Sequence, residues 1–281
     1  MVRNALATLT LTAAAVALGA APAFATTLKW SSASDIPTWD IHSQNNALAN
    51  GVHAAVYESL FYYNKTFELE PMLATGYKQP SPTQLRITLR KGVRFHDGAA
   101  FNADDAKFSL ERAMAKSSNY GVYTQGIERI VKVDESTIDV FTSGPNPVLL
   151  RQLTELRMLD RGWAEKNKSL EPKDSWTKDE NFAHRNANGT GPFMLKSWEQ
   201  DVKLVLVKNP GWWGKADTNL TEIVYTPIKS EATRVAALLL SHQDFSHIPL
   251  HNQVIPWAMK KNIELYHRAD NRIDLRGVKV N

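Results

Sequence analysis

Residues Leu85–Leu110 read LRITLRKGVRFHDGAAFNADDAKFSL, and they are the most informative stretch of the sequence. Apolar side chains alternate with polar ones at its start, at Leu85, Ile87 and Leu89. A period of two is typical of a strand with one buried face. We therefore expect a β-strand that ends near Leu89.

The second half of this stretch predicts turns followed by a helix. Gly92 and Gly98 supply residues that adopt the positive φ of tight turns without steric cost. Asn102 is a candidate helix N-cap, and Asp105 places a carboxylate near the positive end of that helix. The apolar face of the expected helix consists of Ala106, Leu110, Ala113 and Met114. The whole stretch is predicted to be a strand–turn–helix unit.

The N-terminus, residues 1–25, has the pattern of a secretory signal peptide. One positive charge precedes a run of small apolar residues, Ala5–Ala21, and Ala23-Phe24-Ala25 matches the pattern that signal peptidase reads. A short membrane anchor is the alternative, but Pro22 and the shortness of the run argue against it. We expect cleavage before Thr26 and an exported chain that does not span the membrane.

Composition limits the classes of function. The 281 residues are 43% hydrophobic and 22% charged, which predicts a globular fold with a substantial core. The formal charge of +4 is dispersed rather than gathered into a basic stripe, so a nucleic-acid partner is not expected. The absence of cysteine excludes thiol catalysis, Cys-ligated zinc and iron–sulfur clusters.

Beyond the opening stretch, strands and helices alternate without a regular repeat. Strands are expected at Thr27–Ser32, Phe61–Tyr63, Leu220–Tyr225, Asp244–Ile248, Ile263–His267 and Arg272–Val280. Hairpins are expected at Ile127–Phe141 and Phe193–Val207, and helices at Asn45–Leu60, Pro147–Leu159, Glu231–Leu240 and around Pro256-Trp257. Prolines predict turns and short extended pieces at 71–82. Residues 165–190 are expected to form an irregular connector. This mixture favours an α/β or α+β fold.

The opening stretch resembles the family 5 solute-binding proteins of bacterial ABC importers. Leu89–Gly98, LRKGVRFHDG, carries most of the likeness, with Asn102–Ala106 at the family's spacing. Further family-like motifs follow in order at Thr38–Asp40 (TWD), Tyr57–Leu60 (YESL), Pro71–Ala74 (PMLA), Gly189–Phe193 (GTGPF), Asn209–Trp213 (NPGWW) and Glu231–Asp244. The resemblance thus extends along the whole chain after residue 25.

The resemblance implies an α/β fold of the type II periplasmic-binding-protein kind, a mixed sheet with an α+β insert. Family members have two lobes joined at a hinge. Residues 26–61 and 167–270 then correspond to the sheet-and-helix domain of lobe I, and 62–166 to its inserted subdomain. Residues 271–281 would start the hinge crossing. The second lobe would be absent, as in a truncated product, a fragment or one half of a split protein.

The function implied is that of the periplasmic substrate-binding component of an importer, with di- or oligopeptides as solute. Its partners would be permease and ATPase subunits, and the binding protein itself would be a monomer without a cofactor. The alternatives are a nickel or other small-solute binder of the same family, and a non-binding half-protein that retains permease docking. A secreted hydrolase is not favoured because no nucleophile elbow or paired His and Glu motif is present.

Ligand contacts are carried over from the family by position alone. The loop after the first strand corresponds to Asn45, Asn46 and Ala47, and a tyrosine of the cleft corresponds to Tyr120 or Tyr123. The alternative for each is an ordinary surface residue. With half a cleft, a ligand would stay largely hydrated, so we expect weak or no binding by this chain alone.

Other chemically suggestive residues have structural interpretations. The pairs His96-Asp97 and Asp104-Asp105 are better explained as a turn and as helix capping than as acid–base or metal sites. Trp212 and Trp213 are interpreted as a loop packed over the sheet. The histidines His242, His247, His251 and His267 form the one metal-like cluster, but no carboxylate completes a familiar ligand pattern.

Overall fold

The computed structural model describes residues 26–174, 177, 179–215, 217–240, 247–249, 257–259, 262–265 and 274–280. The expected signal peptide and the histidines His242, His251 and His267 lie outside the described residues. Within the described part, no helix is both long and apolar enough to cross a bilayer.

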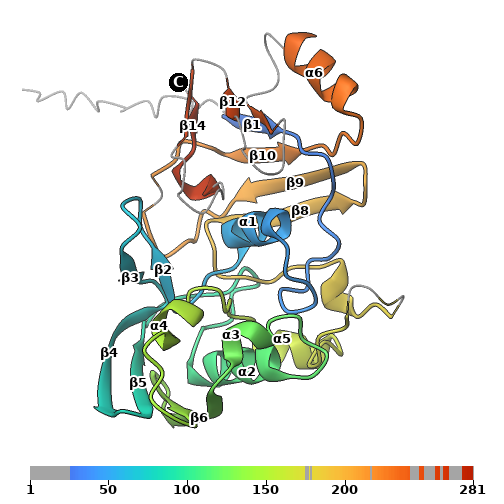
Figure 1. Ribbon diagram of the computed structural model, residues 1–281. Helices are drawn as coiled ribbons and strands as arrows, with labels where there is room; N and C mark the ends of the chain where they lie inside the picture. Colours follow the sequence, from blue (N-terminus) through green and yellow to red (C-terminus); the bar gives the residue numbers. More distant parts are fainter. Residues whose placement is uncertain are drawn as a thin grey trace, which may run out of the picture.

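A mixed six-stranded sheet forms one end of the molecule (Figure 1). Its order is β12-β11-β1-β10-β9-β8, with β1 parallel to β10 and β11 and the other neighbours antiparallel. The strands are β1 (Thr27–Trp30), β8 (Phe193–Glu199), β9 (Lys203–Lys208), β10 (Glu222–Tyr225), β11 (His247–Pro249) and β12 (Trp257–Met259). Helix α1 (Ala47–Val56) packs against β8, and helix α6 (Glu231–Leu240) contacts β11.

An antiparallel four-stranded sheet, in the order β4-β5-β7-β6, forms the other end. Its strands are β4 (Ala74–Ser81), β5 (Gln84–Leu89), β6 (Ile127–Asp134) and β7 (Thr137–Thr142), and α2 (Ala103–Met114) packs on β6 and β7. The hairpin of β2 (Phe61–Tyr63) and β3 (Leu69–Pro71) lies between the two sheets in Figure 1. The remaining elements are α3 (Gly121–Thr124), α4 (Leu149–Gln152), α5 (Arg161–Lys166), η1 (Phe182–His184), β13 (Ile263–Glu264), η2 (Leu275–Gly277) and β14 (Lys279–Val280).

Two hydrophobic clusters fill the interior, one under each main sheet. The first contains the buried faces of β5, β7 and α2, including Ile87, Val140 and Leu110, which have no exposed surface. The second surrounds α1 and the six-stranded sheet and includes Trp39, Phe193 and Tyr225. Tyr225 also stacks at a tilt on Trp30, with 4.4 Å between the ring centroids.

The strand–turn–helix prediction is confirmed. Gly92 and Gly98 have φ angles of +80° and +93°. Asn102 caps α2 by accepting a 2.7 Å hydrogen bond from the Asp104 N–H, and the Asp105 carboxylate accepts from the Asn102 N–H at 2.9 Å. These two bonds form a reciprocal capping box.

Four expectations about elements are wrong. Turns and short extended pieces were expected at 71–82, but one long strand, β4, occupies most of this stretch at a sheet edge, where a proline is tolerated because one side of the strand is unpaired. The expected helix Pro147–Leu159 is reduced to α4, since Arg157 bridges to Ser59 instead. A strand, β12, replaces the expected helix at Trp257 and pairs with β11. The expected strand Arg272–Val280 contains a 3-10 turn, η2.

Candidate functional site

The His96-Asp97 turn connects two family-like motifs that are far apart in sequence. The His96 N–H donates to the Gly189 carbonyl at 2.9 Å, and the His96 Nε2 lies 3.0 Å from the Gly191 carbonyl oxygen. The Asp97 N–H donates to the Asn188 side chain at 3.1 Å. Burial lowers the pKa of His96. These contacts give the turn an architectural role.

The Gly189–Phe193 motif also packs directly on the end of α1. A Cβ on Gly189 would lie 2.0 Å from the Val56 carbonyl oxygen, and one on Gly191 would lie 2.7 Å from it. The Gly191 N–H donates to that same carbonyl at 2.9 Å. Only glycine allows this close approach of two backbones.

Glu58 follows α1 and joins a third motif to these two. Its carboxylate accepts hydrogen bonds from the indole N–H groups of Trp212 and Trp213, at 3.1 and 2.8 Å. Burial raises the pKa of Glu58, although the indole donors favour its charged form. The guanidinium of Arg90 lies 4.3 Å from the ring centre of Trp213, on the face of the indole. Glu58 therefore fixes the positions of the two indoles.

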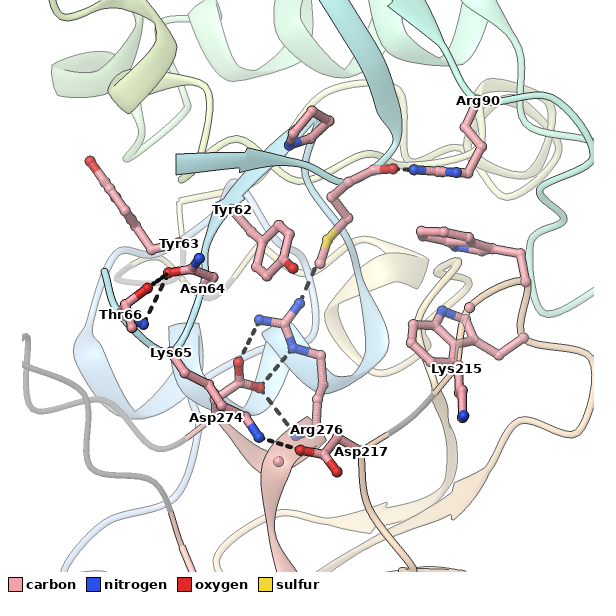
Figure 2. A pocket seen from close by; sticks show the side chains of 16 residues that line it. Tyr62, Tyr63, Asn64, Lys65, Thr66, Arg90, Lys215, Asp217, Asp274 and Arg276 are labelled. Carbon is pink, nitrogen blue, oxygen red and sulfur yellow. Dashed lines mark hydrogen bonds and ion pairs between the residues drawn. The ribbon is translucent and has the colours of Figure 1, made fainter. Parts of the chain in front are cut away.

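These indoles border a pocket of about 550 Å³, which we call the aromatic pocket (Figure 2). Its lining consists of Tyr62, Tyr63, Asn64, Lys65, Thr66, Pro71, Met72, Arg90, Trp212, Trp213, Gly214, Lys215, Asp217, Asp274, Arg276 and Gly277. Figure 2 shows Arg90 and Lys215 on one side and Tyr63 and Lys65 on the other. The volume and the aromatic lining are those of a small-molecule site.

Ion pairs occupy part of the pocket wall. Arg276 forms two charge-assisted bonds to Asp274, at 2.6 and 2.7 Å, and its guanidinium lies 5.4 Å from the Tyr62 ring centre. Lys65 pairs with Asp217, which also accepts from Lys279. Both carboxylates of the wall are thus already neutralised.

A second, much smaller cavity of about 50 Å³ lies between the aromatic pocket and α1. The two cavities share Tyr62, Tyr63, Met72, Asp274 and Arg276. The small cavity also borders Asn50 and Gly51 of α1. The aromatic pocket and the small cavity beside α1 are therefore neighbours that share part of one wall.

Two of the expected ligand contacts, Asn45 and Tyr120, meet at Asn50. The Asn50 side chain donates to the Asn45 Oδ1 at 2.8 Å and accepts from the Tyr120 hydroxyl at 2.5 Å. Asn45, Asn46 and Ala47 are exposed, and Asn46 also caps α1 by accepting from the Ala49 N–H. Asn50 was missed by the sequence analysis, because it lies on the side of the helix opposite to Leu48, Val52 and Ala55 and the apolar pattern gave no signal for it.

The two tyrosines differ in access to solvent. Tyr120 has no exposed surface, and its ring packs edge-on against His42. Tyr123 is partly buried, and its ring centre lies 5.7 Å from that of Tyr120. The structure therefore brings Tyr120 to Asn45 through Asn50 and leaves Tyr123 as the more accessible ring.

A buried ion pair lies behind this surface. Arg112 donates to both carboxylate oxygens of Asp40, at 2.7 and 2.6 Å, and both side chains are essentially inaccessible to solvent. Burial alone would raise the pKa of Asp40, but Arg112 outweighs it and holds this pKa at about 2. Burial and Arg112 lower the pKa of His42 to about 3, so its ring is neutral. The loop that carries Asn45 is thereby attached to α2.

No metal site is found among the described residues, where no three His, Asp or Glu side chains are arranged to hold an ion. Three of the four clustered histidines lie outside these residues, and His247 is in β11.

Comparison with known proteins agrees with this architecture. Solved structures of similar fold are periplasmic binding proteins, among them DppA from Helicobacter pylori in complex with the peptide STSA. It is 28% identical, with a TM-score of 0.68, over 80% of this chain and 47% of that one. NikZ from Campylobacter jejuni, in complex with Ni(L-His), has a TM-score of 0.68 at 21% identity and supports the fold alone. The fold is therefore that of the periplasmic binding proteins.

The family follows from the sequence comparison. The model of the bacterial extracellular solute-binding proteins, family 5, matches residues 68–277, and the chain belongs to this family. The glutathione-binding protein GsiB of Salmonella typhimurium is 29% identical over 236 residues, which is 83% of this chain and 44% of GsiB. The chain thus spans less than half the length of this relative.

Proposed function

We propose that the chain acts as the substrate-binding component of an ABC importer and that its solute is a short peptide. The observation that carries the proposal is family membership together with similarity to a glutathione-binding protein and a peptide-bound DppA. Glutathione and STSA are both short peptides. The chain would work in the periplasm after loss of residues 1–25 and deliver its solute to permease and ATPase subunits.

The contact surface for this role consists of Asn45, Asn46 and Ala47 with Tyr123, supported from behind by Tyr120. The contacts of Asn45 and Tyr120 with Asn50, and of Tyr123 with Tyr120, support a single surface rather than scattered positions. The exposed amides of Asn45 and Asn46 suit the carbonyl and N–H groups of a peptide. We infer that the protein binds its solute without catalysing a reaction, since the Gly191 carbonyl and the Asn188 side chain already engage the His96-Asp97 turn.

Calorimetric titration of the purified chain tests this proposal. The panel contains glutathione, a dipeptide, a tetrapeptide, free amino acids and nickel with histidine. A solute on this exposed surface keeps much of its hydration, so we expect saturable peptide binding weaker than about 1 μM. Free amino acids should bind less well than the peptides.

A matched pair of variants makes the titration specific. Asn45→Ala should weaken peptide binding several-fold, whereas Gln200→Ala, an exposed side chain on the β8–β9 turn, should leave it unchanged. Nickel binding without peptide binding would contradict the proposal. Submicromolar peptide binding would contradict the expectation that one exposed surface binds weakly.

A further inference from the structure

The polar groups of three aromatic residues in the aromatic pocket are already bonded. Glu58 accepts hydrogen bonds from the indole N–H groups of Trp212 and Trp213, at 3.1 and 2.8 Å. The Tyr62 hydroxyl donates to the Glu70 carboxylate at 2.8 Å. The two tryptophans and the tyrosine are half-buried, so part of each ring stays accessible. These rings therefore offer a ligand apolar surface rather than hydrogen bonds.

Two of these rings already have a guanidinium beside one face. Arg90 lies 4.3 Å from the ring centre of Trp213, and Arg276 lies 5.4 Å from the ring centre of Tyr62. Figure 2 shows Tyr62 and Arg276 well to the left of Arg90, so aromatic surface borders the pocket from two sides. A second cation at either ring would meet a like charge, whereas an uncharged ring can stack there.

The charges of the lining also disfavour a cationic ligand. Four of the lining side chains are cationic, namely Lys65, Arg90, Lys215 and Arg276. The lining has two carboxylates, of which Asp217 pairs with Lys65 and Lys279 and Asp274 pairs with Arg276. Since both carboxylates of this lining are paired, an ammonium group that entered the pocket would have to break an existing ion pair.

We propose that the aromatic pocket binds an uncharged aromatic compound, which stacks on the rings of Trp212, Trp213 and Tyr62. The volume of about 550 Å³ has room for a compound with two fused rings. Glu58 does not line the pocket and is a positioning residue, because it holds both indoles by their N–H groups. The lining contains none of the residues of the peptide-contact surface, so this is a second site, independent of the proposed function.

The test compares three probes by calorimetry on the purified chain. Naphthol is uncharged and aromatic, decahydronaphthol is its saturated counterpart, and naphthylmethylammonium is aromatic and cationic. We expect naphthol to bind about fivefold more tightly than decahydronaphthol, because only the aromatic compound stacks on the rings. The cationic probe should bind more weakly than naphthol. Equal or tighter binding of the saturated or the cationic probe would overturn the proposal.

Variants locate the effect. Trp212→Leu keeps an apolar side chain but removes a ring, and it should reduce the preference for naphthol over decahydronaphthol several-fold. Tyr62→Leu should also reduce it, and this variant serves if Trp212→Leu disturbs folding. Trp163→Leu is the matched control, since Trp163 is half-buried but does not line the pocket, and it should leave the preference unchanged. An unchanged preference in either folded pocket variant would overturn the assignment.

Nuclear magnetic resonance of the indole N–H groups places the ligand directly. Addition of naphthol to the nitrogen-labelled chain should shift the indole signals of Trp212 and Trp213 and leave that of Trp163 in place. Shifts confined to other tryptophans would contradict the site. Failure of peptides to bind would leave this result untouched, because no probe is a peptide.

Discussion

Gly189 lies where the fold leaves no room for a side chain. A Cβ there would lie 2.0 Å from a backbone oxygen of α1, which cannot rotate away. We expect Gly189→Ala to lower the free energy of unfolding by about 3 kcal/mol. Gly76→Ala is the matched control, because nothing lies within 4 Å of its added Cβ. Equal midpoints for the two variants in urea unfolding would refute the tight contact.

Glu58 carries a second prediction at the residue scale. Glu58→Ala removes the acceptor of two indole N–H groups, and we expect a loss of about 2 kcal/mol together with a changed near-UV spectrum of the tryptophans. Glu58→Gln keeps one carbonyl acceptor and should lose less. If both variants keep the wild-type spectrum, Glu58 does not fix the indoles.

His42 and His53 make the fold sensitive to acid. Burial, with Arg112 near His42 and Arg157 near His53, lowers both pKa values from 6.5 to about 3. Below pH 6.5 these histidines are protonated in the unfolded chain but stay neutral in the folded chain. The free energy of unfolding therefore falls as the pH is lowered from 6.5 toward 3. We expect a loss on the order of 2 kcal/mol per histidine at pH 5. Urea unfolding at pH 7 and 5 checks this, and His53→Gln should reduce the loss.

At the scale of elements, the capping box determines where α2 begins. Asn102→Ala removes the side-chain acceptor at the helix N-terminus and should lower stability by about 1 kcal/mol. Asn102→Ser keeps an oxygen acceptor and should lose only a fraction of this. Thermal unfolding of the two variants makes the comparison, and equal losses would show that the cap does not stabilise α2.

Local signals explain which elements the sequence predicted. Alternation at Leu85–Leu89, the glycine turns and the Asn102 cap all depend on near neighbours, and all are confirmed. The edge position of β4 and the short bridge at Arg157 depend on strands distant in sequence. Nothing near Pro80 or Pro147 in the chain reports these pairings, so the sequence alone misplaced both.

At the scale of the whole molecule, the family-like motifs meet at one place. The His96 turn, the Gly189 turn and the two indoles all gather around the end of α1. Sequence could show these motifs but not their meeting point, because the contacts join residues that are far apart in the chain. The aromatic pocket went unpredicted for the same reason.

The two hydrophobic clusters bear on domain organisation. One extends over the region from Leu60 to Met158, and the other collects residues before and after it. We propose that they are the cores of the inserted subdomain, 62–166, and of the sheet-and-helix domain, 26–61 and 167–270. Limited proteolysis should release a resistant fragment near these boundaries, and cleavage within β5 or α2 first would contradict the division.

Transport by the living cell tests the central claim most directly. The measurement is uptake of labelled glutathione and of a labelled dipeptide by the source bacterium, with the gene for this chain intact, disrupted, or restored from a plasmid. The account predicts that disruption reduces uptake of at least one peptide to the level seen without the importer's ATPase subunits, and that restoration recovers it. Unchanged uptake of both peptides, with loss of nickel uptake instead, would contradict it.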